Sequence, residues 1–468
     1  MAARWTGPLT SLALSALTAA SAQTSDRGAL IARIDSLVEA EVRDGPTAGM
    51  SVAVYRRGEL LHTKAYGFAD LENRVPASVE TVYRLGSVTK QFTAAAVLQL
   101  AEQGKISLDE DFTRYLPDFS TGGRRVSVTQ LLNHTSGIKS YTSLGEAVSR
   151  DSFRVDLPPA RLLALIRSQP FDFEPGTSWL YNNSGFYLLG QIIERVSGES
   201  YADYLRHHLF ESLGLESTSY CDERAVVRHR AKGYDRAEHG FRNTTPISMS
   251  IPYAAGSLCS TVLDLVAWRR ALANGRVISR ASYQRMIAPT LLAGGWRTNY
   301  GFGLARYRLG GGPNEVVRHG GTINGFQANL MYLPGDDLIV AALANTSGSD
   351  PVGVSDRIAA AVLGLELPMV RDEPVPAEEA ARYTGRYRLG PWTVEVRLQG
   401  DRLVAAQPGL PPSRLLAQGG RRFVARPVFA FGLYGTETTL RFEPGSPSPG
   451  LSLDHPLGGT AAAKRVNR

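Results

Sequence analysis

A serine and a lysine three residues apart are the first candidates for chemistry in this chain. The run Ser-Val-Thr-Lys at 87–90 places a hydroxyl nucleophile before an amine base, and the Ala- and Leu-rich residues 91–100 favour a helix. Residues at i and i+3 of a helix share a face, so the Lys90 amine can reach the Ser87 hydroxyl. The start of a helix also favours an oxyanion. The spacing therefore predicts covalent catalysis by Ser87.

The same spacing occurs a second time, at Ser136 and Lys139. This copy lies in a turn-rich stretch and has Gly137 inside what would be its first helical turn. Because a loop does not fix the geometry of residues i and i+3, we place the nucleophile at Ser87 and not at Ser136.

A serine that cleaves an amide or ester also needs a proton donor for the leaving group and two donors for the oxyanion. Residues 173–185 form a turn that leads into a helix and would present Tyr181 and Asn183 at an exposed edge. A phenol near an ammonium can act as a base, and an amide can bind a peptide-like substrate. Taken singly, each residue favours a structural role instead: Tyr181 a packed aromatic residue, and Asn183 a helix cap.

A third group lies at Arg-His-Gly-Gly-Thr, residues 318–322. A strand that ends in glycines lets a substrate backbone approach closely. His319 and Gly321 are therefore candidates for binding the substrate. The backbone N–H of Thr322 could then pair with that of Ser87 as an oxyanion hole.

The elements that must position these groups follow from the hydrophobic pattern. An amphipathic helix is expected at 26–43, and strands at 49–55 and 60–68 flank a hairpin turn. Short apolar runs separated by turns predict an antiparallel meander, and a helix follows it. The meander strands are 316–319, 327–333 and 338–343, and the helix is 354–363. This pattern indicates an α/β (α+β) fold, with an antiparallel sheet flanked by helices.

The middle of the chain is predicted to be helical, and its end to be all-β. The helices are expected at 128–132, 159–168, 184–196, 201–209 and 263–273, the last after a Ser260 or Thr261 cap. The proline-rich residues 366–377 read as a linker. Beyond it, short strands predict a small β domain over 378–468; they lie at 383–389, 392–398, 402–406, 422–425 and 438–442.

Composition narrows the class of protein. A hydrophobic content of 43% with 20% charged residues is ordinary for a soluble globular protein. The net charge of +7 comes from basic residues without a run, so we expect no nucleic-acid partner. The 8 His residues show no ligand spacing beyond the adjacent His207 and His208, and we expect no metal and no organic cofactor.

The N-terminus is typical of an exported protein. Arg4 precedes an apolar segment at 9–20, and Ala-Ser-Ala at 20–22 has the form of a signal peptidase site, which predicts a signal peptide over 1–22. The alternative is an uncleaved anchor, for which the segment is short. After cleavage we expect no integral membrane segment and a periplasmic or secreted protein. Cys221 and Cys259 are the only cysteines, and an oxidising compartment favours a disulfide between them over two buried thiols.

Taken in order, the three groups resemble the serine β-lactamase and penicillin-binding protein superfamily, in particular its branch of class C β-lactamases, D,D-carboxypeptidases, D-aminopeptidases and esterases. That family has Ser-x-x-Lys, then Tyr-x-Asn, then Lys, His or Trp followed by x-Gly. Ser87 and Lys90, Tyr181 and Asn183, and His319 and Gly321 match these motifs. Residues 128–138 and 256–265 resemble further family segments, and the resemblance defines a hydrolase domain over 26–365.

The resemblance implies a mechanism and a fold. Ser87 would attack a carbonyl, Lys90 and Tyr181 would move its proton, and Asn183 would hold the substrate amide. Either Lys90 or Tyr181 can be the primary base. The implied fold includes an all-helical subdomain, and the substrate would be a small molecule or peptide, a class that includes cell-wall peptides.

Two positions depart from the class C β-lactamase pattern. His319 stands where those enzymes have Lys, and an ordinary His is only partly charged near neutral pH. We therefore expect weaker, pH-dependent carboxylate binding, with a KM for acidic substrates that rises above about pH 6.5. This favours peptidase or esterase relatives over dedicated β-lactamases. Asn182 replaces the small Ser common between Tyr and Asn.

The leading hypothesis is an exported serine hydrolase that acts on peptide amides, esters or lactams through an acyl-enzyme. The alternative is a catalytically silent penicillin-binding-like sensor or scaffold, whose β domain is the interaction surface. The complete set of three motifs favours the enzyme. An α/β-hydrolase of the lipase type is excluded because no Gly-x-Ser-x-Gly is present.

Overall fold

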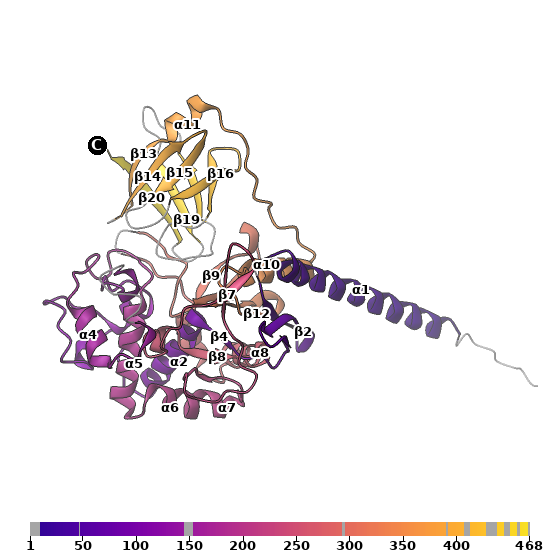
Figure 1. The fold of residues 1–468 in the computed structure, drawn as a ribbon, viewed down its shortest axis with the longest axis horizontal. Helices are drawn as coiled ribbons and strands as arrows, with labels where there is room; N and C mark the ends of the chain where they lie inside the picture. Colours follow the sequence, from indigo (N-terminus) through magenta and orange to yellow (C-terminus); the bar gives the residue numbers. More distant parts are fainter. Residues whose placement is uncertain are drawn as a thin grey trace, which may run out of the picture.

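A computed structural model describes residues 10–45, 47–144, 153–292, 295–389, 392–406, 412–426, 438–443, 450–455 and 459–466. A main body of sheet and helices carries a smaller barrel on one side, and the N-terminal part of helix α1 (Thr10–Arg43) extends away from the body (Figure 1). The predicted leader falls partly in α1 and partly on residues 1–9, which lie outside the described residues.

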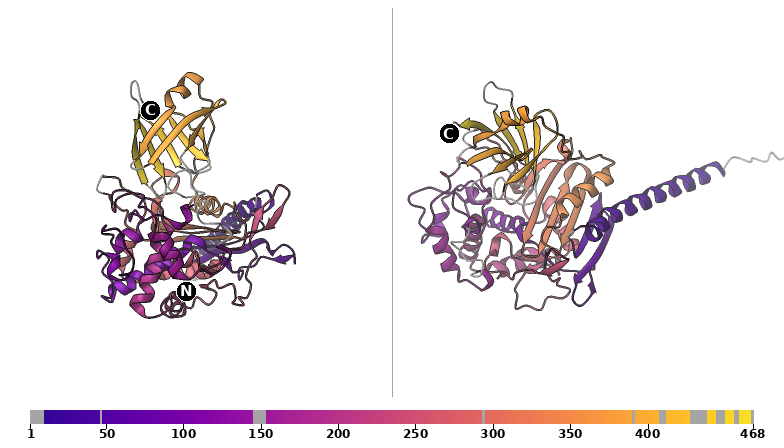
Figure 2. Two further views of the ribbon diagram at one scale, coloured as in Figure 1. Left: turned by 60° about the vertical axis from the view of Figure 1, so that its left-hand side comes forward. Right: turned by 45° about the horizontal axis from the view of Figure 1, so that its top comes forward.

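An antiparallel seven-stranded sheet forms the centre of the body (Figure 2). Its strands, in spatial order, are β3 (Val75–Pro76), β2 (Glu59–Asp70), β1 (Gly49–Arg56), β12 (Leu338–Ala344), β11 (Phe326–Leu333), β10 (Glu315–Ile323) and β9 (Ala305–Arg308). The predicted hairpin and meander are both present. The N-terminal strands β1–β3 and the later strands β9–β12 are separated in sequence by the helical part of the chain. The pairing of β1 with β12 joins these two halves into one sheet.

Helices cover both faces of this sheet. On one face, Ile34 and Val38 of α1 and Ile358 of α10 (Pro351–Leu363) pack against β1, β11 and β12 in a single apolar cluster. On the other face, α2 (Thr89–Glu102) and α8 (Val262–Ala273) join the helical subdomain in the largest cluster. The fold is therefore a layered α/β arrangement, as predicted.

The helical subdomain lies between the two halves of the sheet in sequence. Its α-helices are α3 (Val128–Leu132), α4 (Pro159–Arg167), α5 (Asn183–Ser197), α6 (Tyr201–Leu205), α7 (Glu211–Leu213) and α9 (Arg280–Met286). A π-turn at Arg206–Phe210 joins α6 to α7, where a continuous helix is expected from sequence. Thr261 caps α8, since its side chain accepts from the backbone N–H of Asp264.

Short strands and helical turns connect these parts. The strands β4 (Tyr83–Arg84), β8 (Leu258–Ser260) and β5 (Ser219–Tyr220) form a small sheet, and β6 (Tyr234–Arg236) pairs with β7 (Phe241–Asn243). The short helical turns are η1 (Gly86–Val88), η2 (Phe112–Arg114), η3 (Tyr141–Ser143), η7 (Tyr253–Ala255), η8 (Leu309–Gly311) and η9 (Pro334–Asp336).

The C-terminal part is a closed, eight-stranded antiparallel barrel preceded by α11 (Ala377–Tyr383). Its strands are β13 (Gly385–Leu389), β14 (Trp392–Gln399), β15 (Arg402–Ala406), β16 (Ser413–Ala417), β17 (Arg422–Arg426), β18 (Thr438–Phe442), β19 (Leu451–His455) and β20 (Gly459–Val466). An all-β module is predicted from sequence, but α11, three of the strands and the closure of the barrel are not.

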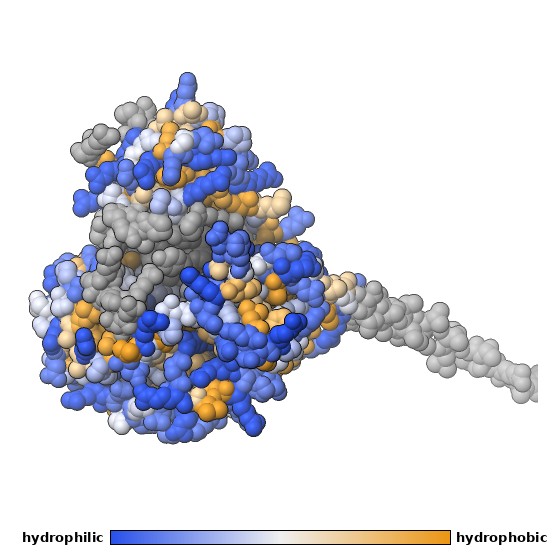
Figure 3. Space-filling model, in the orientation of Figure 1, coloured by the Kyte–Doolittle hydropathy of each residue, from blue (hydrophilic) through white to orange (hydrophobic). Residues whose placement is uncertain are grey.

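The barrel touches the body near the start of β20. Thr460 forms an isolated β-bridge with Arg297, and a single apolar cluster runs from Tyr181 and Tyr300 in the body to Tyr383 at the barrel. Side chains on the visible face of the molecule are mostly hydrophilic, with small separate apolar patches (Figure 3). Within the described residues, no helix combines the length and the apolar character needed to cross a membrane.

Candidate active site

Ser87 lies in a tight turn and not in the first turn of a long helix. It is the middle residue of the 3₁₀ turn η1, and α2 begins two residues later at Thr89. Strand β8 forms hydrogen bonds with the residues before and after this turn. Leu85 N–H donates to Leu258 O (2.8 Å), and Leu258 N–H donates to Thr89 Oγ1 (3.1 Å). The nucleophile is thus partly exposed in an otherwise buried segment.

The Lys90 amine is completely enclosed beside Ser87. Its Nζ lies 3.0 Å from Ser87 Oγ, 2.8 Å from Asn183 Oδ1 and 2.7 Å from Ala255 O. The side chain has no exposed surface, and this burial lowers the pKa of Lys90 well below its usual value.

Burial favours the neutral amine, and the three contacts can accommodate that form. The Asn183 and Ala255 oxygens can only accept, so they take the two N–H bonds of an uncharged amine. The nitrogen lone pair then faces the Ser87 hydroxyl, which can donate its proton to it. Lys90 is therefore arranged to act as a base toward Ser87.

From sequence, Asn183 is a candidate both for the helix cap and for a site residue, and the structure divides these two roles between Asn182 and Asn183. Asn182 is the helix cap of α5, since its side chain accepts from Gly185 N–H at 2.8 Å. The Asn183 side chain is thereby free to bridge Lys90 and Thr142, whose Oγ1 lies 3.0 Å from Nδ2. The replacement of Ser by Asn at 182 thus supplies a cap to the helix that presents Asn183.

Tyr181 lies over Lys90 and has a protonated hydroxyl. Lys90 Nζ is 4.8 Å from the centre of its ring. Burial raises the pKa of Tyr181 well above its usual value; the nearby Ser87 side chain opposes this shift, although the two make no hydrogen bond of ordinary geometry. Tyr181 is both a packed aromatic residue and a hydroxyl that faces the site, and its protonated form suits a proton donor.

The expectation that His319 titrates near neutral pH is wrong. His319 is only 2% exposed, and this burial lowers its pKa to about 3. Its Nδ1 lies 2.5 Å from Gly320 O and its Nε2 lies 2.7 Å from the Tyr300 hydroxyl. His319 is therefore neutral over the physiological range, because its position on β10 takes it out of water.

The free end of β10 lies directly against the nucleophile turn. Strand β9 pairs with β10 only as far as Arg318, so residues 320–323 are unpaired with it. A Cβ atom at Gly321 would lie 1.9 Å from Leu85 O and 3.2 Å from Ser87 N, and one at Gly86 would lie 2.9 Å from Thr322 N. The absence of side chains at both glycines brings the backbone of Thr322 beside that of Ser87, as an oxyanion hole requires.

The second Ser-x-x-Lys copy makes no such site. Lys139 pairs with Asp172 at 2.6 Å, while Ser136 Oγ accepts from the backbone N–H of Ile138.

Cys221 and Cys259 are joined in a disulfide with Cα atoms 5.3 Å apart, next to β4 and the nucleophile turn. No group of three or more His, Cys, Asp or Glu within the described ranges could hold a metal ion.

Sequence reasoning missed three contributors to the site. Ala255 acts through its backbone carbonyl, and Thr142 supports Asn183. Tyr300 contacts His319 and lies in a Gly-rich run at 299–303. Gly301 and Gly303, which follow Tyr300 and flank Phe302, are the one signal that could have drawn attention to this loop.

Comparison with known proteins agrees with this geometry. A family model described as Beta-lactamase matches residues 34–365. A D-aminopeptidase of Gluconobacter oxydans (strain 621H) is 28% identical over 359 residues, which cover 76% of this chain and 66% of the relative. The matched part is thus slightly under two thirds of that relative's length.

Solved structures extend the likeness. The octameric penicillin-binding protein homologue from Pyrococcus abyssi is 26% identical, with a TM-score of 0.66, and covers 93% of this chain and 100% of its own. The D-amino acid amidase from Ochrobactrum anthropi SV3, in complex with D-phenylalanine, is 26% identical with a TM-score of 0.63 and covers 72% of this chain and 99% of its own.

Proposed function

This chain belongs to the Beta-lactamase family, and we propose that it is a serine hydrolase that cleaves amides of D-amino acids through an acyl-enzyme at Ser87. The observation that carries the proposal is the set of contacts of Lys90. An enclosed amine that donates to two carbonyl-type oxygens and faces the Ser87 hydroxyl is a preformed general base. The substrate class is supported by the relatives named D-aminopeptidase and D-amino acid amidase.

Acylation starts with proton transfer from Ser87 to Lys90. Ser87 Oγ forms a bond to the substrate carbonyl carbon as its proton passes to Lys90 Nζ. The carbonyl oxygen takes up the displaced electron pair and is stabilised by the backbone N–H groups of Ser87 and Thr322. Because Lys90 is neutral before the reaction, the ammonium exists only once charge has developed on the substrate.

Collapse of this intermediate releases the amine. Tyr181 donates its hydroxyl proton to the leaving nitrogen as the C–N bond breaks, and the Lys90 ammonium returns a proton to Tyr181. A water molecule then gives a proton to Lys90 and attacks the ester carbon. As the C–O bond to Ser87 breaks, the Lys90 ammonium returns that proton to Ser87 Oγ, and the acid is released. One amide and one water become one acid and one amine.

A substrate panel tests this function. Purified protein is incubated with the p-nitroanilides of D-Ala, L-Ala, D-Phe and L-Phe, with the nitrocefin lactam and with p-nitrophenyl acetate. We expect turnover of the D-anilides above that of the L-anilides, and none with Ser87→Ala. Turnover of nitrocefin alone, or equal rates with Ser87→Ala, would reject the proposal.

The proposal includes export. The apolar segment at 9–20 and the Ala-Ser-Ala site at 20–22 support it, as does a disulfide, since disulfides form in oxidising compartments. Expression of the full chain in a bacterial host, followed by fractionation and N-terminal sequencing, tests it. We expect periplasmic protein that begins at Gln23; cytoplasmic protein that retains Met1 would contradict export.

A further inference from the structure

His319 has both ring nitrogens engaged inside the protein. Its Nδ1 lies 2.5 Å from the carbonyl oxygen of Gly320, and a carbonyl can only accept, so Nδ1 carries the hydrogen. In a neutral imidazole the other nitrogen, Nε2, is then bare and accepts from the Tyr300 hydroxyl at 2.7 Å. The ring therefore has no N–H left to offer to a substrate.

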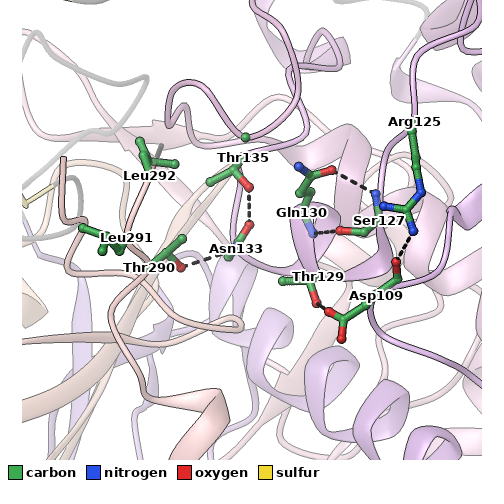
Figure 4. Close-up of a pocket in the computed structure, with 11 residues that line it drawn as sticks. Asp109, Arg125, Ser127, Thr129, Gln130, Asn133, Thr135, Thr290, Leu291 and Leu292 are labelled. Carbon is green, nitrogen blue, oxygen red and sulfur yellow. Dashed lines mark hydrogen bonds between the residues drawn. The ribbon is translucent and has the colours of Figure 1, made fainter. Parts of the chain in front are cut away.

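Tyr300 is itself firmly held. It has no exposed surface. Its backbone N–H donates to Thr298 Oγ1 (3.3 Å), and its carbonyl accepts from the hydroxyls of Thr298 and Thr290 (3.1 Å each). Thr290 in turn accepts from Asn133 at the wall of a cavity of about 300 Å³ (Figure 4). The loop beyond Tyr300 rests on α2, where a Cβ at Gly303 would lie 2.7 Å from Lys90 O.

Burial and two neighbouring basic side chains disfavour a charged imidazole at His319, and the Gly320 carbonyl opposes them. Lys90 faces it from α2, and Arg318 neighbours it on β10 and is paired with Asp356 of α10. The rings of Tyr181 and Tyr300 lie 6.1 Å and 5.6 Å away, and the buried His134 also interacts with it. Among these groups the only carboxylate, Asp356, already has Arg318 as its partner.

We propose that Tyr300 is a positioning residue that donates to His319 Nε2 and so fixes the imidazole in its neutral Nδ1–H form. In this form His319 supports residues 320–322, the edge of β10 beyond its pairing with β9, and does not bind a substrate carboxylate. The link to catalysis is the Nδ1–H bond to Gly320 O, which orients the peptide that precedes Gly321 and Thr322. That edge carries the second oxyanion donor in the proposed function, on which the catalytic part of this inference rests.

A consequence follows for the substrate class. With His319 engaged on both sides, this part of the site offers no fixed cation to a terminal carboxylate. Substrates that are neutral at this point, such as amides and esters, fit it better than free D,D-peptides. Of the matched pair D-Ala-D-Ala amide and D-Ala-D-Ala, the amide is expected to have the higher kcat/KM throughout pH 5.5 to 8, because His319 does not acquire charge there.

The tautomer of His319 is directly measurable. The full chain is labelled with ¹⁵N-histidine, and the His319 signals are assigned by their loss in His319→Gln. In the wild type we expect a protonated Nδ1 and a bare Nε2 that do not change between pH 5 and pH 8. A protonated Nε2, or titration of His319 within that range, would overturn the proposal without any need for a substrate.

Two tyrosine variants separate positioning from packing. Tyr300→Phe keeps the ring and removes the donor, so His319 is expected to shift toward the Nε2–H form or to exchange between forms. Tyr234→Phe is the control, since Tyr234 is also buried and its hydroxyl contacts Glu72 and the backbone N–H of Leu71, neither of which is a residue of the site. Unchanged His319 signals in Tyr300→Phe would overturn the proposal; a Tm close to that of Tyr234→Phe shows that the fold is retained.

Kinetics supply the second readout. For D-Ala p-nitroanilide, Tyr300→Phe is expected to lower kcat about tenfold, the worth of one hydrogen bond, with little change in KM. An equal loss in Tyr234→Phe would overturn the catalytic link. A wild type with the expected tautomer but no turnover of any substrate rejects the proposed function alone, whereas an active enzyme with a protonated Nε2 rejects this inference alone.

Discussion

Lys90 Nζ lies 3.0 Å from Ser87 Oγ, and the other two partners of the amine are neutral oxygen acceptors. The ammonium form thus lacks a compensating charge at hydrogen-bond distance and is also cut off from water. The neutral amine that results is the form able to take the Ser87 proton. The acid–base chemistry of the site depends on this one relationship.

Replacing Asn183 by Asp tests the charge state of Lys90. A carboxylate in place of the amide oxygen 2.8 Å from Nζ favours the ammonium and so raises the Lys90 pKa. Activity requires the neutral amine, so it is lost as pH falls through this pKa. A raised pKa moves the acid limb of the pH profile to higher pH.

The measurement is kcat/KM for p-nitrophenyl acetate, which does not titrate, from pH 5 to pH 10. Asn183→Ala is the control, because it removes the amide without adding charge and should not move the acid limb upward. An acid limb at the same pH in Asn183→Asp and the wild type would contradict the assignment of Lys90 as the base. His319→Gln should leave the position of this limb unchanged, because the pKa of His319 is about 3.

Tyr181→Phe distinguishes a proton donor from a base. The raised pKa of Tyr181 keeps its hydroxyl protonated, so it serves the leaving group more than Ser87. An anilide leaving group needs this proton and a p-nitrophenolate does not. We expect kcat/KM to fall about 100-fold or more for D-Ala p-nitroanilide, within the range for lost general acid catalysis, and less than about tenfold for the p-nitrophenyl ester of the same acid. Equal losses for both substrates would argue that Tyr181 acts on Ser87 itself.

Adjacent glycines in β10 provide a matched pair of substitutions. A methyl group at Gly321 would meet Leu85 O at 1.9 Å and separate the two oxyanion donors, whereas one at Gly320 would meet only Val352 and Ala328 O, at 3.5 Å and 3.6 Å. Gly321→Ala is therefore expected to lower kcat at least about 100-fold, comparable to the loss of one oxyanion donor. Gly320→Ala should retain activity within about tenfold, since these are ordinary contact distances. Similar activities of the two variants would show that the close approach of β10 to Ser87 is unnecessary.

The disulfide supports the strand behind the nucleophile turn. Cys259 lies in β8, which pairs with β4 directly before that turn, and the bridge closes a loop of 38 residues. Its removal in a Cys221→Ala, Cys259→Ala double variant is expected to lower the free energy of unfolding by about 3–4 kcal/mol. Urea unfolding with and without reductant measures this. Reductant should destabilise only the wild type; equal stability of both proteins without reductant would show that the two thiols are not bonded.

The site could be predicted from sequence where it depends on local spacing. Ser87 and Lys90 are close because they share one turn of chain, and the order of the three motifs located Tyr181 and Asn183 by resemblance. What spacing could not show is the division of labour between Asn182 and Asn183. Which of two adjacent amides caps α5 depends on the backbone angle at the helix start, and the structure assigns the cap to Asn182.

The properties of His319 could not be read from its neighbours in the chain. Its pKa is set by burial and by the contact with Tyr300, both of which arise only when distant segments pack together. The barrel presents the same difficulty. Strand β20 contains three consecutive alanines, which have weak strand preference, and its pairing with β13 is a contact between the two ends of the domain.

The nucleophile is tested most directly by the mass of the intact protein during turnover. The protein is mixed with p-nitrophenyl acetate, quenched in acid within seconds and weighed, and the labelled peptide is identified after digestion. We expect one added acetyl group on Ser87 in the wild type and none in Ser87→Ala. We also expect Lys90→Met to accumulate the adduct far more slowly. An adduct of the same mass in Ser87→Ala, or a label on any residue other than Ser87, would contradict the assignment of Ser87 as the nucleophile.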